Sequence, residues 1–311
     1  MKTSLVAGGS GFIGSHLCEY LLGKGERVIA VDNLGSGSKD NVQGLLEMDR
    51  FKLIRQDVRE PLEIDDRIDH IYNLASRASP ADFSEHPVEI LMTNSQGTYN
   101  LINLAQDKNA RFLMASTSEC YGDPEVSPQP ETYWGRVNPV GPRSCYDESK
   151  RFSEALTMAY VRNHGLDGRI IRIFNTYGPK MRLDDGRVVP NFVTQALTGK
   201  PMTVYGDGNQ TRSFCYVSDL VRGIYLMMHA DTNGEVVNLG NPVEMTVLEF
   251  ARKIKAMTGN ASEIVFSPMP ENDPLQRRPD IGKAKRLLGW EPLVGLDQGL
   301  KLTIDWFKTR L

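Results

Sequence analysis

The 311-residue sequence predicts an α/β protein, a doubly wound parallel sheet joined to a smaller carboxyl-terminal lobe. In its first half, short runs rich in β-branched residues alternate with amphipathic stretches, a pattern typical of parallel βαβ units. A glycine-rich turn follows the first of these runs. From about residue 176 the sequence becomes rich in Gly, Pro and Arg, which indicates a second lobe. We therefore expect a first domain over 1–175 and a lobe over 176–311, some of whose segments return to the first domain.

The elements follow from the spacing of apolar residues. Helices are predicted over 12–25, 94–108 and 145–165, and we expect the last two to pack together on the outside of the sheet. Gly165 closes the third helix. The predicted strands of the first half are 3–9, 27–33, 51–58, 68–76 and 110–117, and shorter strands at 202–206 and 212–217 belong to the second lobe.

Composition excludes several classes of protein. The formal net charge is −3 and the pI is about 6.0, so there is no broad basic field for nucleic acid. No apolar run approaches the roughly 20 residues that span a bilayer. The four cysteines form no Cys-x-x-Cys pair and no secretory segment precedes Gly8, so we expect reduced thiols in a cytoplasmic protein. The five histidines lack ligand spacing, and no metal site is expected.

The segment VAGGSGFIGSHL, residues 6–17, has the features of a dinucleotide-binding turn. Gly8, Gly11 and Gly14 follow a strand and open a helix, where glycine allows close approach of a pyrophosphate. Asp32 ends the next strand, and its carboxylate is placed to accept hydrogen bonds from the adenosine ribose. Since a carboxylate repels a 2′-phosphate, we expect NAD rather than NADP on a Rossmann-type fold. The predicted cofactor contacts are Gly8, Gly11, Phe12, Ile13, Gly14, Asp32, Asn33, Gly35, Ser36, Gly37, Asp57, Val58, Leu74, Ser76, Thr93, Ala115, Tyr146, Lys150 and Thr176.

Tyr146 and Lys150 form a candidate catalytic pair. They are four residues apart and therefore neighbours on one helical face. A tyrosine with a pKa of roughly 10 is a poor base at neutral pH, but an adjacent ammonium and a cationic nicotinamide favour the phenolate. Tyr146 would then take a proton from a sugar hydroxyl while a hydride leaves the same carbon.

The chain resembles the extended branch of the short-chain dehydrogenase/reductase superfamily, and within it the UDP-glucuronate decarboxylases, or UDP-xylose synthases. The matching segments are ASTSECYGDPEVSPQPETYWGRVNPVGPRSCYDESKR (115–151), RIFNTYGPKMRLDDGRVVPNF (172–192), PMTVYGDGNQTRSFCYVSDL (201–220), VNLGNP (237–242) and DPLQRRPDIGKAKRLLGWEP (273–292). The resemblance implies tightly held NAD and a nucleotide-sugar substrate, UDP-glucuronate, decarboxylated through a 4-keto intermediate with return of the hydride.

The resemblance assigns roles to three neighbouring residues. Thr117 would assist the tyrosine at the sugar C4 hydroxyl, and Glu119 would act as acid or base near C5 and C6, with Ser118 beside it. The dTDP-glucose dehydratases have an aspartate at the position of Ser118, which argues against loss of water. The GDP-mannose dehydratases have a similar Thr-Ser-Glu, so a 4,6-dehydratase remains an alternative, as does a 4-epimerase. A non-catalytic NAD-sensing protein is a third reading, disfavoured by the intact Thr117, Tyr146 and Lys150 set.

Residues of the second lobe are expected to hold the nucleotide sugar. Arginines suit the diphosphate, and polar or flat side chains suit the uracil. The segment ASRASP departs from the decarboxylase pattern at Arg77, which is expected near the sugar end. By resemblance the chain would form a homodimer through a four-helix bundle built from roughly 94–107 and 147–163. The predicted substrate contacts are Asn175, Arg187, Asn191, Tyr205, Gln210, Arg212 and Arg277.

Overall fold

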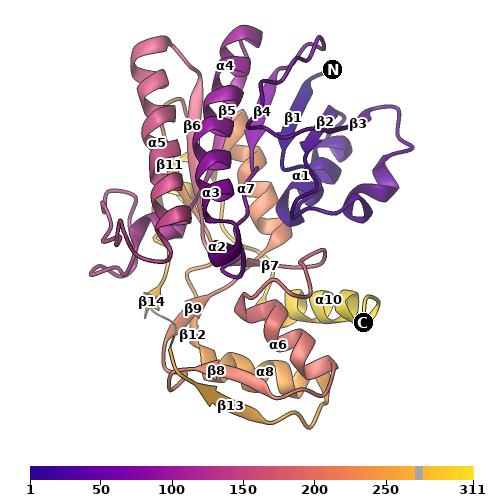
Figure 1. Cartoon of the computed structure of the whole chain (residues 1–311), viewed down its shortest axis with the longest axis vertical. Coiled ribbons are helices and arrows are strands. Elements are labelled where there is room, and N and C mark those ends of the chain that lie inside the picture. Colours follow the sequence, from indigo (N-terminus) through magenta and orange to yellow (C-terminus); the bar gives the residue numbers. More distant parts are fainter. Residues whose placement is uncertain (270–275) are drawn as a thin grey trace.

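The computed structural model describes residues 1–269 and 276–311 and contains a seven-stranded parallel sheet (Figure 1). The start of the DPLQRRPDIG segment, residues 273–275, lies outside the described residues. All strand pairs in this sheet are parallel, so their carboxyl ends share one edge, which faces the second lobe. In spatial order the strands are β11 (Val236–Leu239), β6 (Gly168–Ile173), β5 (Arg111–Thr117), β4 (His70–Asn73), β1 (Thr3–Ala7), β2 (Arg27–Asp32) and β3 (Phe51–Arg55).

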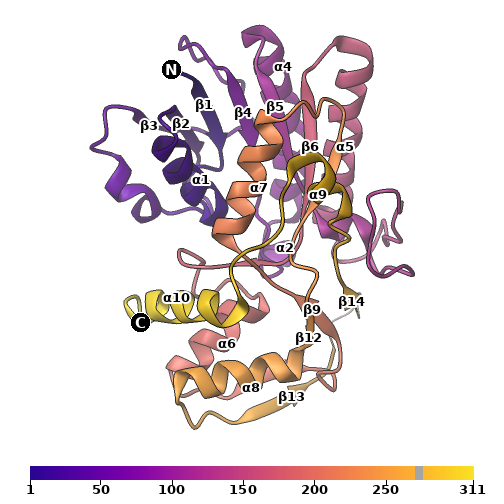
Figure 2. The ribbon, with the colours of Figure 1, turned by 180° about the vertical axis from the view of Figure 1, so that it is seen from behind.

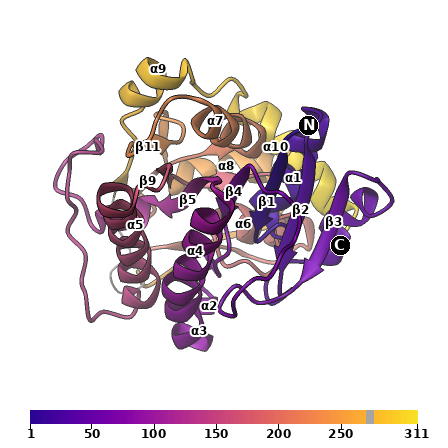
Figure 3. The same ribbon diagram turned by 90° about the horizontal axis from the view of Figure 1, so that it is seen from above.

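Helices cover both faces of the sheet, as Figure 3 shows from above. One face carries α1 (Phe12–Gly23) and α7 (Val217–His229), which pack on each other. The opposite face carries α4 (Thr98–Lys108) and α5 (Ser144–His164), which contact each other as expected. The helical run before α4 is longer than predicted and consists of α2 (Asp82–Glu85), α3 (Pro87–Met92) and a π-helical turn, η2 (Thr93–Gly97).

The first strand is shorter than predicted, because Gly8 adopts a φ of +77° and ends the extended backbone after Ala7. Both β1 and most of β2 are fully buried, which is typical of parallel strands covered on two faces. Two 3₁₀ segments follow strand ends at the carboxyl edge, η1 (Lys39–Leu45) and η3 (Ser118–Tyr121). The edge therefore carries short irregular segments where ligands bind in such folds.

The second lobe consists of small sheets covered by helices (Figure 2), and β11 returns from it to the edge of the central sheet (Figure 3). Helix α8 (Val247–Thr258) begins with a capping box between Thr246 and Glu249. The strands are β7 (Thr176–Tyr177) with β10 (Cys215–Tyr216), β8 (Met202–Tyr205) with β13 (Ile264–Ser267), and β12 (Glu244–Thr246), β9 (Thr211–Ser213) and β14 (Gln276–Arg277). The helices of this lobe are α6 (Val188–Leu197), α8 and α10 (Leu296–Lys308). Helix α9 (Gly282–Leu288) instead lies beside the central sheet, where it contacts β11 and α7 (Figure 2).

Within residues 1–269 and 276–311, no helix combines the length and apolar character needed to cross a membrane. The four cysteines are buried and form no disulfide.

Candidate active site

A cavity of about 660 Å³ lies between the carboxyl edge of the central sheet and the second lobe. Every candidate site residue from the sequence lines this cavity except Gly35. Gly35 is exposed on the loop after β2, where its backbone N–H donates to the Asn33 side chain at 2.8 Å. The structure thus brings together candidates from both halves of the chain.

The glycine turn between β1 and α1 has no room for side chains. A Cβ on Gly14 would lie 2.0 Å from the carbonyl oxygen of Gly8, and a Cβ on Gly8 would meet the backbone of Leu74 and Ala75 at 2.9 Å. Helix α1 begins without a side-chain cap, so its first N–H groups remain available to an anion. These glycines therefore form the close-fitting cradle that a dinucleotide pyrophosphate requires.

Asp32 is fixed at the end of β2 by two backbone donors. Its Oδ2 accepts the Ser10 N–H at 2.9 Å and its Oδ1 accepts the Leu34 N–H at 2.8 Å. Burial raises the pKa of Asp32, and the two backbone hydrogen bonds oppose that rise. A carboxylate oxygen has more than one acceptor site, so each oxygen can accept a further hydrogen bond from a ribose hydroxyl.

Thr117, Tyr146 and Lys150 meet where β5 and α5 face the cavity. Burial raises the pKa of Tyr146, and a hydrogen bond with Thr117 partly opposes this. The Lys150 ammonium donates to the Ala115 carbonyl at 3.0 Å and lies 5.8 Å from the Tyr146 ring centre. Burial lowers the pKa of Lys150 to about 8. A buried tyrosine beside a cation and a hydroxyl is suited to exchange a proton with a substrate alcohol.

Glu119 lies at the same end of β5, between two guanidinium groups. Arg143 donates to its Oε2 at 2.6 Å, and Arg277 pairs with its Oε1. Burial favours the neutral carboxyl, but the charges of Arg277 and Arg143 outweigh burial and hold the pKa of Glu119 at about 2. Arg277 also donates to the Ser118 hydroxyl at 3.4 Å, so it is anchored beside the catalytic candidates.

The second lobe supplies polar groups to the far part of the cavity. Arg187 forms a bidentate pair with Asp185, and Asn191 donates to the Gly186 carbonyl at 3.0 Å. Gln210 donates to the Tyr205 carbonyl at 2.7 Å, while its buried Oε1 has no hydrogen-bond partner among the described residues. This oxygen is an acceptor placed at the wall of a ligand cavity. The remaining candidates on this lining are Asn175, Thr176 and Arg212.

Comparison with known proteins agrees with this geometry. The family model for GDP-mannose 4,6 dehydratase matches residues 5–303. The UDP-glucuronic acid decarboxylase 1 of Danio rerio is 52% identical over 310 residues, which cover 100% of this chain and 73% of that protein. The UDP-glucuronic acid decarboxylase 5 of Arabidopsis thaliana is 52% identical over 99% of this chain and 89% of its own length.

The chain belongs to the UDP-glucuronic acid decarboxylase family.

This family shares its fold with epimerases. The solved UDP-glucuronic acid 4-epimerase of Bacillus cereus, in complex with UDP-glucuronic acid and NAD, superposes with a TM-score of 0.89 and 30% identity. The alignment covers 99% of this chain and 100% of the epimerase. The central sheet is therefore a Rossmann-type sheet, as the sequence predicts.

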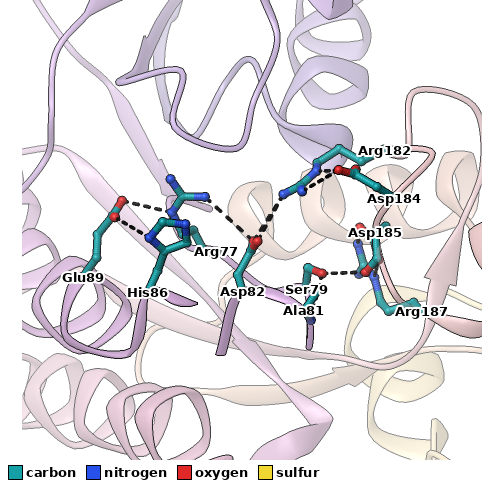
Figure 4. A network of polar contacts seen from close by, with 10 residues as sticks. All are labelled: Arg77, Ser79, Ala81, Asp82, His86, Glu89, Arg182, Asp184, Asp185 and Arg187. Carbon is teal, nitrogen blue, oxygen red and sulfur yellow. Dashed lines mark hydrogen bonds and ion pairs between the residues drawn. The ribbon is translucent and has the colours of Figure 1, made fainter. Parts of the chain in front are cut away.

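Arg77, where the chain departs from the expected decarboxylase pattern, lines the cavity and belongs to an ionic network (Figure 4). Its Nε donates to Glu89 at 3.0 Å, and its Nη1 faces Asp82 at 3.9 Å. Asp82 also accepts from Arg182, which comes from the loop after β7. A Cβ on Gly35 would lie 2.9 Å from Arg77 Nη2, so the guanidinium also adjoins the loop after β2. The expected position at the sugar end stays a prediction.

Several residues of the site could not be found from local patterns. Arg143 is one, because its partner Glu119 lies in a different segment. The other cavity-lining cations missed are Lys180, Arg182 and Arg310.

A cluster of Glu26, His70 and His229 lies apart from this cavity: Glu26 precedes β2, His70 begins β4 and His229 ends α7. Its ligand atoms lie within 4.8 Å of one another, a geometry compatible with a metal ion. Its members come from separate segments, so ligand spacing along the sequence could not reveal it.

Proposed function

We propose that the chain catalyses NAD-dependent decarboxylation of UDP-glucuronate to UDP-xylose through a 4-keto intermediate. The observation that carries this proposal is the half-buried Glu119, held by two arginines beside Thr117 and Tyr146. Oxidation at C4 needs only the tyrosine, the lysine and the hydroxyl, so the additional carboxylate supplies proton chemistry at a neighbouring carbon. Full-length identity of about 52% to named UDP-glucuronic acid decarboxylases supports the choice of substrate.

The residues present fit NAD. Gly8, Gly11 and Gly14 would hold its pyrophosphate at the start of α1, and Asp32 would bind the adenosine ribose. The buried Ser76 hydroxyl, which has no partner among the described residues, would add a hydrogen bond deeper in the cavity. When bound, NAD would accept a hydride from sugar C4 and return it to the same carbon.

Tyr146 would take the proton of the C4 hydroxyl and give it back at the end of the cycle. Lys150 stabilises the phenolate by its charge, and Thr117 aligns the sugar oxygen with the tyrosine. The resulting 4-keto acid loses carbon dioxide because the electron pair left at C5 delocalises into the C4 carbonyl. Thr117 and Tyr146 would then stabilise the enolate oxygen by hydrogen bonding.

Glu119 would donate a proton to C5 once carbon dioxide has left. Since its pKa is held at about 2 in the free protein, it starts the cycle as a carboxylate and must receive a proton before it can give one to C5. Ser118 and Arg277 would position the glucuronate carboxylate beside it. Arg187 and Arg212 would contact the diphosphate, and Gln210 the uracil, with Asn175, Asn191 and Tyr205 completing the substrate contacts.

A 4-epimerase is the alternative, favoured by the likeness to the Bacillus cereus UDP-glucuronic acid 4-epimerase, which is solved with UDP-glucuronic acid. An epimerase keeps the carboxylate and inverts C4. A 4,6-dehydratase is the other alternative, favoured by the matching family model. Ser118 argues only against the dTDP-glucose type, which has an aspartate at this position; it leaves open the GDP-mannose type, which has a similar Thr-Ser-Glu.

We also propose a homodimer formed through α4, α5 and the helical run before α4. Five large apolar side chains are exposed on these elements, and a second copy of the same surface would cover them: Val88, Leu91, Met92, Tyr99 and Phe152. In this proposal residues 1–175 bind NAD and 176–311 mainly bind the nucleotide sugar, with β11 returning to the sheet. A cytoplasmic location is proposed from the free, buried cysteines.

A proton NMR time course with UDP-glucuronate, with and without added NAD, tests the activity. Signals of UDP-xylose would support decarboxylation followed by reduction at C4. UDP-galacturonate would instead identify an epimerase. Unchanged UDP-glucuronate under both conditions would refute the proposal, and UDP-glucose, dTDP-glucose and GDP-mannose would then be tried.

A further inference from the structure

The proposed reaction consumes one proton from solvent in every turnover, and this inference rests on that reaction. The C5–C6 bond breaks, the carboxylate leaves as carbon dioxide, and its electron pair stays on C5 until a new C5–H bond forms. The proton that Tyr146 takes from the C4 hydroxyl returns to the same oxygen, so it cannot form the new C5–H bond. A proton must therefore reach C5 while the nucleotide sugar and cofactor fill the main cavity.

A second cavity of about 290 Å³ lies on the other side of Glu119. Glu119, Arg143 and Arg277 line both cavities, so these three side chains form the wall between them. The cavity is also lined by Asp123, Arg136 and Asn138, which are exposed, and by Asp147, which is buried. It thus extends from exposed residues to the back of the candidate acid.

Asp147 is the buried titratable group of this cavity that the proposed mechanism does not use. It lies in the first turn of α5, one residue after Tyr146, and is 6% exposed. Its Oδ1 has no hydrogen-bond partner among the described residues. Its Oδ2 faces Arg143 Nε at 3.9 Å, and the same guanidinium donates to Glu119. Asp147 and Glu119 therefore approach one cation from two sides.

We propose that Asp147 and the second cavity deliver the solvent proton that ends on C5, with Glu119 as the last carrier. A neutral Asp147 gives its proton through cavity water to the Glu119 carboxylate, and Glu119 passes it to the carbanion at C5. Asp147 is left ionised and recovers a proton from solvent at the exposed rim. Since Asp147 acts through Glu119, it is a positioning residue for this proton and does not touch the sugar.

The space and the charges suit this route. The cavity is many times larger than the roughly 10–15 Å³ that one water needs, and the unpartnered Oδ1 offers such water a polar contact. Burial, followed by the charge of Glu119, raises the pKa of Asp147 to about 7, so the residue can hold a proton near neutral pH. The charged groups that face it are Glu119, Arg143, Arg277 and Glu148, and Asp123 and Arg136 line the same cavity.

The competing explanation is that Asp147 only helps to position Arg143. A purely structural defect would disturb Tyr146 and slow the first oxidation as well as the later steps. A defect in proton delivery would spare the first oxidation and slow only the steps after loss of carbon dioxide. The two explanations therefore differ in which step becomes slow.

The experiment compares Asp147→Asn with wild type and with Asp231→Asn, using NAD-loaded protein and UDP-glucuronate. Asp231 lies just after α7, is exposed, and lines neither cavity. Stopped-flow absorbance of the reduced nicotinamide gives the rate of C4 oxidation. It also gives the fraction of the bound nicotinamide that is reduced during steady turnover. Release of carbon dioxide and UDP-xylose in H₂O and D₂O gives the turnover rate and its solvent isotope effect.

For Asp147→Asn we expect unchanged initial oxidation, turnover lowered about tenfold, a larger solvent isotope effect and more reduced nicotinamide at steady state. Asp231→Asn should match wild type within about twofold. Equal slowing of oxidation and turnover in Asp147→Asn, or turnover equal to wild type, would overturn the proposed proton relay through Asp147. It would leave the proposed function standing. A wild-type protein that releases no carbon dioxide from UDP-glucuronate would overturn the proposed function and the relay with it.

Discussion

Arg277 pairs with Glu119 although the two residues come from different lobes, Glu119 after the central strand β5 and Arg277 from β14. The pair lies at the wall between the two cavities, where Arg277 is only 2% exposed and Glu119 is half-buried. A buried cation that loses its partner pays a large desolvation cost, so each member of this pair fixes the other. The position of the second lobe is in this way coupled to the charge of the candidate acid.

Glu119→Gln should lower decarboxylation more than tenfold while NAD binding is retained, because the amide cannot carry the C5 proton. The product is followed by proton NMR and NAD binding by calorimetry. Glu125→Gln is a matched control, since Glu125 is exposed and forms its ion pair with Arg136, which is also exposed. Near-normal turnover in Glu119→Gln would remove Glu119 from the mechanism.

Tyr146→Phe should lower turnover at least a hundredfold without loss of folding, because the ring that stacks on Phe83 at 5.1 Å is kept and only the hydroxyl is lost. Formation of reduced nicotinamide on adding UDP-glucuronate is the measurement. Tyr160→Phe, on the same helix but outside the cavity, is the control. A fast first oxidation in Tyr146→Phe would assign the base to another residue.

Asp32→Asn should weaken NAD binding about tenfold and reduce the preference for NAD over NADP. The amide keeps one acceptor for the Ser10 or Leu34 N–H but loses the negative charge that repels a 2′-phosphate. Calorimetric titration with each dinucleotide checks this. If the ratio of the two affinities does not change, the selectivity comes from other residues.

Asp147→Asn should be more stable than wild type at pH 8, and the difference should shrink toward pH 4. The pKa of Asp147 in the folded protein, about 7, lies above the 3.8 of an ordinary aspartate in the unfolded chain, so between these values the unfolded chain loses a proton that the folded chain keeps. Ionisation of Asp147 thus lowers the free energy of unfolding of the wild-type protein as pH rises from about 4 to 7. Above about pH 7 this loss is constant. Urea unfolding of the variant and of wild type at pH 4, 6 and 8 measures the difference in their free energies of unfolding. An Asn variant that is less stable at pH 8 would contradict the prediction.

Met92→Glu with Phe152→Glu should convert the proposed dimer to a monomer, since two charges would be buried in an apolar interface. Sedimentation at micromolar concentration compares the oligomeric state of this double variant with that of wild type. Leu302→Glu is the control, because Leu302 is a similarly exposed apolar residue on α10. A wild-type protein that sediments only as a monomer would defeat the dimer proposal.

The parts of the site that depend on neighbours in sequence could be predicted from the sequence. The glycine turn is one, because a tight turn needs glycine at fixed spacing, and the Tyr146 and Lys150 pair is another, because helical residues four apart share a face. Three features could not be predicted in this way: the ion pair between Glu119 and Arg143, the second cavity, and the place of β11 in the sheet. They arise from contacts between distant segments, whose partners no local period specifies.

The place of β11 has a consequence for synthesis of the protein. β6 lies between β5 and β11, and its outer edge is covered only when residues 236–239 arrive. While the ribosome makes the intervening segment, the backbone donors and acceptors on that edge lack a strand partner, and such edges invite pairing with other chains. The nascent protein therefore passes through an interval in which its central sheet is vulnerable to aggregation, and slow translation between β6 and β11 would lengthen it.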